Sequence, residues 1–546
     1  MTSEPVRVRP VGERAVLVEL ASTGDVHRLW RTLRVRPVAG VEEIVAGASS
    51  LLLRLDPAGP LVPVDLSMVA KALPEMGEID TAPPRAVTIP VSYDGPDLEA
   101  VAEMCGLSPQ EVVERHGATE YTVAFLGFSP GFAYLAGGPG ALSVPRLDTP
   151  RPSVPAGSVG LADEMAAVYP QSTPGGWRII GRTGTVMFDP ARNLPALLSP
   201  GDRVRFHPAT GDVSSGAGRL SHPLTPPSPG QPAVLVLDRG PHLTVQDLGR
   251  QGWAHMGVPA AGAADRGAAR AANQLVGNPD GAAVMEALTG PVRLRMRADR
   301  LISVTGADAP VTVDGLPARR YTALALRSGS ELVIGRCRSG LRIYLAVSGG
   351  FDVPVVLGSR STDTLSGLGP PPLRDGDLVA VGPDRRTRNG QLRSDRVGTG
   401  PPGSGPVIGR EVGLELPALR VTGGPPRERP DVLEIRARWG PRDDRLGPSG
   451  RLALASTEWS VSPRSDRVGM RLDGRALSLV HPGGVPSEGM IAGAVQVPPA
   501  GHPIVLMRNH PPTGGYPVVA VVDDLSLDDL AQAEPGTRLR FVFPPT

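Results

Sequence analysis

The fold is decided by Pro174-Gly-Gly-Trp177-Arg-Ile-Ile180 and by Pro200-Gly-Asp-Arg-Val-Arg-Phe206, which follow Pro155-Ala-Gly157. All three stretches recur near the C-terminus in the same order, as Pro499-Ala-Gly501, Thr513-Gly-Gly-Tyr516-Pro-Val-Val519 and Pro535-Gly-Thr-Arg-Leu-Arg-Phe541. In each copy a Gly-Gly-aromatic turn leads into a β run, and a Pro-Gly turn starts a strand with alternating arginine and apolar residues. Each piece alone is common turn chemistry, but the shared order predicts two β domains built on one plan.

The whole chain is predicted to be mainly β. It has 546 residues, enough for roughly three to four domains, and its 68 glycines and 61 prolines with 40% hydrophobic residues are typical of a turn-rich globular protein. Linkers rich in Pro and Gly are predicted at 223–232 and about 397–406. We therefore expect a small α/β domain at 1–84 and three β-rich domains at 85–222, 233–396 and 405–546, the first of them a barrel or a sandwich.

Composition excludes several functions. The net charge of +1 provides no field for nucleic acid, and no apolar run is long enough for a membrane span or a signal peptide. Cys105 and Cys337 are too far apart in sequence for a disulfide framework or a metal knuckle, so a cytoplasmic location is expected. The histidines show no metal-site spacing. Lys71 is the one lysine, and its context fits neither a nucleotide loop nor a biotin carrier.

Two helices have clear end signals. Ser108-Pro109-Gln110-Glu111 forms a capping box with proline at the first helical position, and Gly117 is the expected stop. In the second half, a helix is predicted from Asp265 as N-cap to Val276, with Gly277 after its end.

Motifs in both halves of the chain resemble those of known protein families. The first half resembles the KipI family, also called the B subunit of 5-oxoprolinase or allophanate hydrolase subunit 1, at Tyr121–Val123, Gly127–Leu135, Pro145-Arg146, Pro150-Arg151, Val154–Val159 and Pro174–Thr183. The second half resembles the KipA family, also called the C subunit of 5-oxoprolinase or allophanate hydrolase subunit 2, at Thr244–Arg250, Gly257–Pro259, Asp265, Asn273–Asn278, Glu286, Gly349-Gly350, Gly358–Arg360, Ser465–Gly469, Ser487–Gly489 and Gln496–Pro499.

The resemblance implies a fused B/C component of an ATP-dependent 5-oxoprolinase with cyclophilin-like β-barrels. Such an enzyme opens 5-oxoproline to glutamate with a separate LamB/YcsF-type 5-oxoprolinase component, its A subunit, and this chain alone is expected to be inactive. ATP, with Mg²⁺, is expected in the assembled enzyme, with no covalent biotin on this chain; a homo-oligomer is a further expectation. One alternative is a carboxyltransferase component acting on urea or another small amide with a separate biotin carrier. The other is a regulator that binds a sensor histidine kinase.

The chain departs from the family pattern in two segments. Arg508–Thr513 reads Arg-Asn-His-Pro-Pro-Thr where the family has an Asp and a Gln-Thr pair, and Gly369–Leu373 reads Gly-Pro-Pro-Pro-Leu where it has Gly-Arg-x-Leu. If either segment contacts substrate, these changes affect activity.

Opening a lactam with ATP requires cations for the transferred phosphate and donors for a developing oxyanion. The candidate catalytic residues are His116, Arg146, Arg151 and Arg182, expected to converge near Gly175-Gly176, whose backbone supplies the donors. His116 would carry a proton near neutral pH; the alternative is an interaction with its helix dipole. The arginines are alternatively surface ion-pair partners.

Further residues are candidates for substrate binding, either in a pocket or in a buried hydrogen-bond network that fixes the barrel. Trp177 and Tyr516 either stack on a ligand or pack in a core, and Asp466-Arg467 is alternatively a structural ion pair. The full set is Ser158, Gly175, Gly176, Trp177, Gln246, Asp247, Arg250, Asp265, Asn273, Glu286, Asp466, Arg467, Ser487, Glu488, Gln496 and Tyr516.

Overall fold

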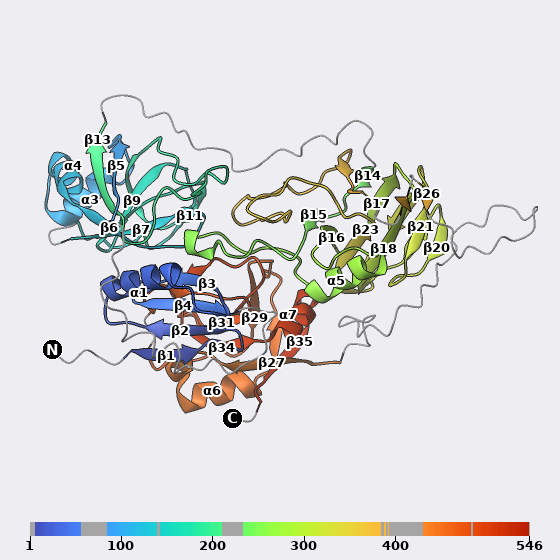
Figure 1. Cartoon of the computed structure of the whole chain (residues 1–546). Coiled ribbons are helices and arrows are strands. Elements are labelled where there is room, and N and C mark those ends of the chain that lie inside the picture. The colour runs from blue at the N-terminus through green and yellow to red at the C-terminus, as the bar shows by residue number, and fades with distance from the viewer. Residues whose placement is uncertain are drawn as a thin grey trace, which may run out of the picture.

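The computed structural model describes residues 6–55, 84–138, 142–209, 233–383, 387–388, 391–392, 430–481 and 484–544. Lys71 and both predicted linkers lie outside these residues. The prediction of a mainly β protein is confirmed, with 37% strand and 15% helix. Four sheet systems follow one another along the chain (Figure 1). No helix among the described residues is long and apolar enough to cross a bilayer.

The N-terminal sheet is buried on both of its faces. On one face Val16 and Val18 pack with α1 and with Phe125 of the first barrel, and on the other Ala15 and Leu17 pack against the C-terminal barrel. This explains why both sets of alternating residues are apolar. The strand order is β1-β2-β4-β3, and the elements are β1 (Arg7–Pro10), β2 (Ala15–Glu19), α1 (Thr23–Val35), β3 (Val41–Ala46) and β4 (Ser50–Leu55).

The first barrel is a seven-stranded sheet of order β12-β9-β10-β7-β6-β13-β5. An isolated bridge between Ser92 and Arg182 joins its two edges, so the barrel is nearly closed. The predicted capping box at Ser108 is confirmed, but α4 continues through Gly117 to Ala118. The elements are β5 (Ala86–Val91), α3 (Leu98–Cys105), α4 (Pro109–Ala118), β6 (Tyr121–Leu126), β7 (Ala133–Gly137), β8 (Arg151–Val154), β9 (Ser158–Ala162), β10 (Met165–Val168), β11 (Thr173–Gly175), β12 (Arg178–Arg182) and β13 (Arg203–Pro208).

The third unit packs a six-stranded sheet and a five-stranded sheet around one core. The orders are β20-β19-β22-β17-β14-β24 and β15-β16-β23-β18-β21, and α5 covers the outer face of β18 and β23. Asp265 caps α5 by accepting from Ala268 N at 2.8 Å, and Gly277 follows in a left-handed conformation, as predicted.

The elements of this unit are β14 (Ala233–Asp238), β15 (His242–Gln246), η1 (Ala254–Met256), α5 (Arg266–Leu275), β16 (Val284–Leu288), β17 (Val292–Met296), β18 (Arg300–Asp308), β19 (Val311–Val313), β20 (Leu316–Ala318), β21 (Leu324–Leu326), β22 (Glu331–Ile334), β23 (Ser339–Val347) and β24 (Leu378–Ala380). A short pair follows, β25 (Thr387–Arg388) and β26 (Gln391–Leu392).

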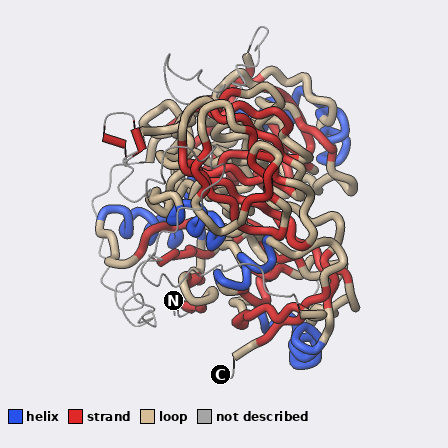
Figure 2. The backbone as a smooth tube through the Cα atoms, turned by 90° about the vertical axis from the view of Figure 1, so that its right-hand side faces the viewer, coloured by secondary structure: helices blue, strands red, loops and turns tan. Residues whose placement is uncertain are grey.

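The C-terminal unit is a closed barrel of order β27-β34-β31-β32-β29-β28-β35. Figure 2 shows that strands make up more of the backbone than helices do. The elements are β27 (Leu433–Trp439), η2 (Asp443–Leu446), α6 (Gly447–Ser456), β28 (Trp459–Val461), β29 (Gly469–Asp473), β30 (Glu488–Gly489), β31 (Ala494–Gln496), β32 (Ile504–Leu506), β33 (Thr513–Gly514), β34 (Val518–Val522), α7 (Asp524–Ala531) and β35 (Arg538–Val542).

The two copies of the sequence repeat occupy matching places. Each Pro-Gly turn starts a closing strand, β13 or β35, and that strand lies parallel to the first strand of its own barrel, β5 or β27. In both strands the apolar residues point into the core, because Val204 and Phe206, like Leu539 and Phe541, are buried.

Candidate functional site

The structure gathers five predicted residues on the first barrel. Trp177 lies at their centre, with the Arg146 guanidinium carbon 5.9 Å from its ring centroid and Arg151 Nη1 3.4 Å from its carbonyl oxygen. Gly175 and Gly176 lead into this residue, and a Cβ on Gly175 would lie 2.3 Å from the Tyr169 hydroxyl. We call Arg146, Arg151, Gly175, Gly176 and Trp177 the Trp177 cluster.

The two guanidiniums of this cluster differ in their partners. Arg151 is held by Asp97 at 2.7 Å, and this hydrogen bond raises the pKa of Arg151. Arg146 has an exposed side chain, and its ion pair with Asp163 is 4.0 Å long. Arg146 is therefore better placed than Arg151 to contact an incoming anion, because it need not abandon a strong hydrogen bond.

Arg182 and Ser158 lie away from the cluster. Arg182 faces Ser158 in the β12–β9 pair, at the far end of β12 from Trp177, which is about 16 Å of extended strand away. Its guanidinium contacts Asp94 at 2.8 Å with both side chains half exposed. The predicted convergence of all three arginines is therefore not what the structure shows.

His116 belongs to the barrel core. Its ring stacks on Phe206 with centroids 4.4 Å apart, and Nδ1 lies 2.7 Å from the Tyr93 hydroxyl. The side chain is fully buried, and burial lowers the pKa of His116 to about 3. A neutral, enclosed imidazole supports packing rather than proton transfer, and it has no charge for the helix dipole.

His116 should make stability depend on pH. The unfolded residue titrates near pH 6.5, so below that pH only the unfolded state takes up the proton, and unfolding becomes easier by up to about 1.4 kcal/mol per pH unit. We expect His116→Phe to reduce the slope of this dependence in urea unfolding between pH 7 and 4.5, while His27, His242, His255 and His510, whose pKa values burial also lowers, keep part of it. The exposed His481→Gln should leave it unchanged, and identical slopes for wild type and His116→Phe would contradict the prediction.

A second group of predicted residues forms a buried polar node in the third unit. Asp247 accepts from the Ser359 hydroxyl at 2.7 Å and from Arg360 N at 2.6 Å. Arg250, 1% exposed, donates to Ser361 O at 2.6 Å and lies 3.9 Å from Asp363. Burial lowers the pKa of Arg250. We call Asp247, Arg250, Ser361, Asp363 and Asn509 the Arg250 node.

Both departures from the family pattern meet this node. Asn509, from the C-terminal barrel, donates to Asp363 Oδ1 at 3.0 Å. Gly369, which precedes Pro370–Pro372, has φ +80°, and a Cβ there would lie 2.1 Å from Ser361 O and 2.9 Å from Arg250 Nη2. The two changed segments are therefore neighbours in space and bear on one set of side chains.

Four buried polar atoms in and beside the node have no hydrogen-bond partner within the described part of the chain. They are Gln246 Oε1, Arg250 Nη1, Thr362 Oγ1 and Asn509 Oδ1. Gln246 and Thr362 adjoin each other through a 3.1 Å hydrogen bond from Gln246 Nε2 to Thr362 O. Together the four atoms comprise one guanidinium donor, one hydroxyl and two carbonyl acceptors, which match the N–H and C=O groups of a small amide.

A third group joins the two barrels of the second half. Glu286 contacts Arg467 of the C-terminal barrel and accepts from Ala264 N at 2.9 Å and the Tyr344 hydroxyl at 2.8 Å. Burial raises the pKa of Glu286, but Arg467 and Arg342 outweigh it and hold the pKa below its usual value. We call Glu286, Arg342, Tyr344 and Arg467 the Glu286 network.

Asp265 lies beside this network. Burial, followed by the charge of Asp528, raises the pKa of Asp265 to about 7. Its Oδ2 accepts from Gln532, the residue after α7, at 2.8 Å. Asp528 itself accepts from Arg266 N at 3.0 Å and Gly267 N at 2.9 Å, so α7 supplies a second cap for α5.

The remaining predicted residues make local or structural contacts. Asn273 is fully buried and donates to the carbonyls of Asp280 and Ala282. Asp466 accepts from Val468 N and Gly469 N in a turn, so its predicted pairing with Arg467 is not seen; Arg467 pairs with Glu286. The others are Ser487, whose carbonyl accepts from Ala48 N, Glu488, which pairs with Arg442, Gln496, which donates to Tyr516 O, and the exposed Tyr516.

Sequence reasoning missed the partners that complete these networks. Asp363 and Ser361 lie in the polar run Ser359–Thr364, which follows a quoted family motif and was the available signal. Arg342 and Tyr344 alternate with apolar residues in an otherwise buried strand, a weaker signal. Asp528 lies on the short helix α7 and Gln532 directly follows it, and no sequence signal pointed to either residue.

The chain belongs to the carboxyltransferase-domain family. Subdomains C and D match residues 6–198, and subdomains A and B match residues 256–543. Over 205 residues the chain is 42% identical to the B subunit of 5-oxoprolinase from Escherichia coli O157:H7, covering 36% of this chain and 94% of that one. Over 315 residues it is 32% identical to the C subunit of 5-oxoprolinase from Escherichia coli K12, covering 57% and 90%.

The same two-part arrangement exists in a solved structure. The crystal structure of TTHA0988 matches with a TM-score of 0.81 and 33% identity, covering 97% of this chain and 99% of that chain. The resemblance to fused KipI and KipA proteins is thereby confirmed. The chain is related to components of an enzyme that acts as a multi-subunit complex.

Proposed function

We propose that this chain is the fused B/C component of an ATP-dependent 5-oxoprolinase and works with a separate LamB/YcsF-type component. The observation that carries the proposal is the presence in one chain of two halves that resemble the B and C subunits, each matching nine-tenths or more of its relative. The halves also contact each other, because Thr513 Oγ1 of the second half accepts from Phe128 N of the first at 3.2 Å.

The Trp177 cluster and the Arg250 node are proposed to take different parts of the reaction: the cluster binds phosphate, and the node binds the amide. ATP is proposed to phosphorylate the lactam oxygen, which releases ADP. Water then adds to the ring carbon, the C–N bond breaks as the nitrogen takes up a proton, and a second water hydrolyses the resulting acyl phosphate to glutamate and phosphate. Arg146 supplies an exposed guanidinium for a phosphate. The node supplies amide-matching donors and acceptors that hold the lactam or the loops around it. Among the described residues no group of three carboxylate, imidazole or thiol ligands is placed for a metal ion, so Mg²⁺ is assigned to ATP in the assembled enzyme.

We expect the purified chain to show no ATP hydrolysis that depends on 5-oxoproline, and to gain it when the LamB/YcsF-type component is added.

In the assembled complex Arg146→Gln should lower turnover by about tenfold or more, since an exposed charge-assisted contact is lost. A coupled ADP-release assay measures both results.

Two controls make the assay decisive. Arg203 is an arginine of the same barrel, equally exposed and paired with Glu120, so Arg203→Gln should retain turnover. Urea with a biotin carboxylase and a carboxylated biotin carrier tests the alternative. Carboxyl transfer to urea, with no response to 5-oxoproline and the LamB/YcsF-type component, would replace the proposal by the carboxyltransferase function.

A further inference from the structure

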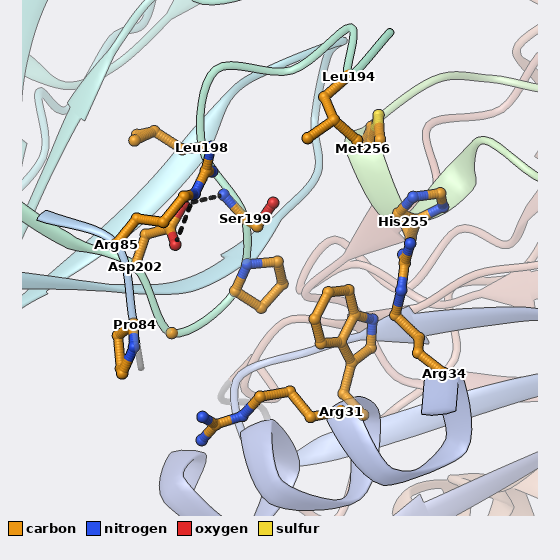
Figure 3. A pocket seen from close by; sticks show the side chains of 13 residues that line it. Arg31, Arg34, Pro84, Arg85, Leu194, Leu198, Ser199, Asp202, His255 and Met256 are labelled. Atoms are coloured by element: carbon orange, nitrogen blue, oxygen red, sulfur yellow. Dashed lines mark hydrogen bonds and ion pairs between the residues drawn. The ribbon is translucent and has the colours of Figure 1, made fainter. Parts of the chain in front are cut away.

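A cavity of about 260 Å³ lies where the N-terminal domain, the first barrel and η1 meet (Figure 3). It is lined by α1, by the loop 194–202 and by His255 and Met256 of η1. None of the sequence-predicted site residues lines it. At about 30 Å³ per water molecule, the space corresponds to roughly nine waters, which suits a small organic molecule rather than a nucleotide.

The charge of this cavity is positive. Arg31 and Arg34 extend from α1 to its wall, and neither forms an ion pair with any carboxylate that the structure describes. The remaining arginine, Arg85, is neutralised by Asp202, which also accepts from Ser199 N at 2.8 Å. Two guanidinium charges are therefore left for a ligand.

Figure 3 shows how these charges are arranged. The Arg34 guanidinium lies beside the His255 imidazole, and Arg31 extends in the other direction, toward Pro84. Burial, followed by the charge of Arg34, lowers the pKa of His255 to about 4, so this residue is neutral at physiological pH. The two arginines border the space from separate sides. A ligand with one charged end can therefore pair with one of them while its body occupies the rest of the space.

The rest of the wall is largely apolar, with one unmet donor. Trp30 is 7% exposed, its ring lies 4.8 Å from the Arg34 guanidinium carbon, and its Nε1 has no hydrogen-bond partner among the described residues. An indole N–H only donates, so its missing partner is an acceptor. The apolar lining consists of Trp30, Pro84, Leu194, Leu198, Pro200 and Met256.

We propose that this cavity binds a small organic anion, a carboxylate or phosphate group on an apolar body. The oxyanion pairs with Arg34 or Arg31, and the body packs on Trp30 and the leucines. Free inorganic phosphate lacks the apolar body, and a neutral aromatic molecule lacks the charge. The site is separate from the Trp177 cluster and the Arg250 node, so it does not depend on the proposed lactam chemistry.

Titration calorimetry of the full chain with benzoate, phenyl phosphate, benzyl alcohol and inorganic phosphate tests this site. We expect at least one of the two aromatic anions to bind about tenfold or more tightly than benzyl alcohol and inorganic phosphate. The tighter of the two identifies the preferred oxyanion. Benzyl alcohol binding as tightly as the anions, or no binding of either anion at millimolar concentrations, would overturn the proposal.

Variants localise the site. Arg34→Gln and Arg31→Gln should weaken binding of the preferred anion, by about tenfold for the arginine that pairs with it. Arg28→Gln is the matched control, because Arg28 lies on the same helix but pairs with Asp25 at 3.0 Å. Leu194→Trp keeps every charge and fills the cavity from an exposed position, so it should abolish binding. Equal losses in the Arg28 and Arg34 variants, or full binding by Leu194→Trp, would show that surface charge alone attracts the anion.

Discussion

Arg467→Met is expected to lower the free energy of unfolding by about 3–5 kcal/mol, because it leaves Glu286 as a buried carboxylate without its closest cation. Arg342 lies 3.6 Å from the same oxygen, beyond hydrogen-bond distance, so we expect it to offset the lost contact only in part. The effect should be large because Arg467 and Glu286 are only 8% and 5% exposed, so water cannot solvate the charge left behind.

Urea unfolding of the full chain measures this loss. Arg464→Met, three residues away, removes an arginine whose side chain is 76% exposed and should cost less than about 0.5 kcal/mol. The double variant Glu286→Leu with Arg467→Met should recover part of the stability, because no unpaired carboxylate remains. A cost below about 1 kcal/mol for Arg467→Met would contradict the prediction and mean that Arg342 or water compensates Glu286 when Arg467 is removed.

Gly127→Ala is expected to disrupt the contact between the two halves of the chain. Gly127 is the residue directly after β6 of the first barrel, and a Cβ there would lie 1.8 Å from Thr513 Oγ1 in the second half. Overpacking of this kind typically costs about 1–3 kcal/mol, so we expect a lower melting temperature. If the halves act as one component, turnover in the complex with the LamB/YcsF-type component should fall as well.

Removing the obstructing side chain tests the cause. Thr513→Gly alone loses the hydrogen bond from Phe128 N and should cost about 1 kcal/mol. Combined with Gly127→Ala it should be less harmful than the sum of the two changes, because the clash is gone. Gly138→Ala is the control, since its added Cβ meets nothing closer than 4.0 Å. Strictly additive effects would show that Gly127 matters for a reason other than Thr513.

Local features of the fold were predictable from sequence, and contacts between distant segments were not. The N-cap of α5 and the capping box of α4 follow from residues within four positions of one another, and both form as expected. Gln246, Asp247 and Arg250, three of the predicted substrate-binding residues, lie at or just after one strand end, whereas Glu286, from the same predicted set, belongs to a separate network. Their partners at 359–363 and Asn509 come from elsewhere in the chain and are brought to them only by tertiary packing.

The first barrel shows the same limit. Arg146, Arg151 and Trp177 meet, whereas Arg182, which was predicted to converge with them, lies at the far end of β12. Successive residues of a strand lie about 3.3 Å apart, so the five steps from Trp177 to Arg182 place these two residues about 16 Å from each other. His116 was predicted to transfer protons because its side chain titrates near neutral pH. The aromatic rings that bury it come from β6, β13 and the segment after β5, and no sequence pattern indicated that they would surround it.

The second cap on α5 has a consequence for synthesis on the ribosome. Asp528 accepts from Arg266 N across 262 residues of chain. At roughly 5–20 residues per second, the N-terminal end of α5 is synthesised about 13–50 seconds before Asp528. During that interval Asp265 alone caps the helix, and water is the only partner for the amides that Asp528 will later bind. The third unit therefore reaches its final form only when translation of the chain is nearly complete.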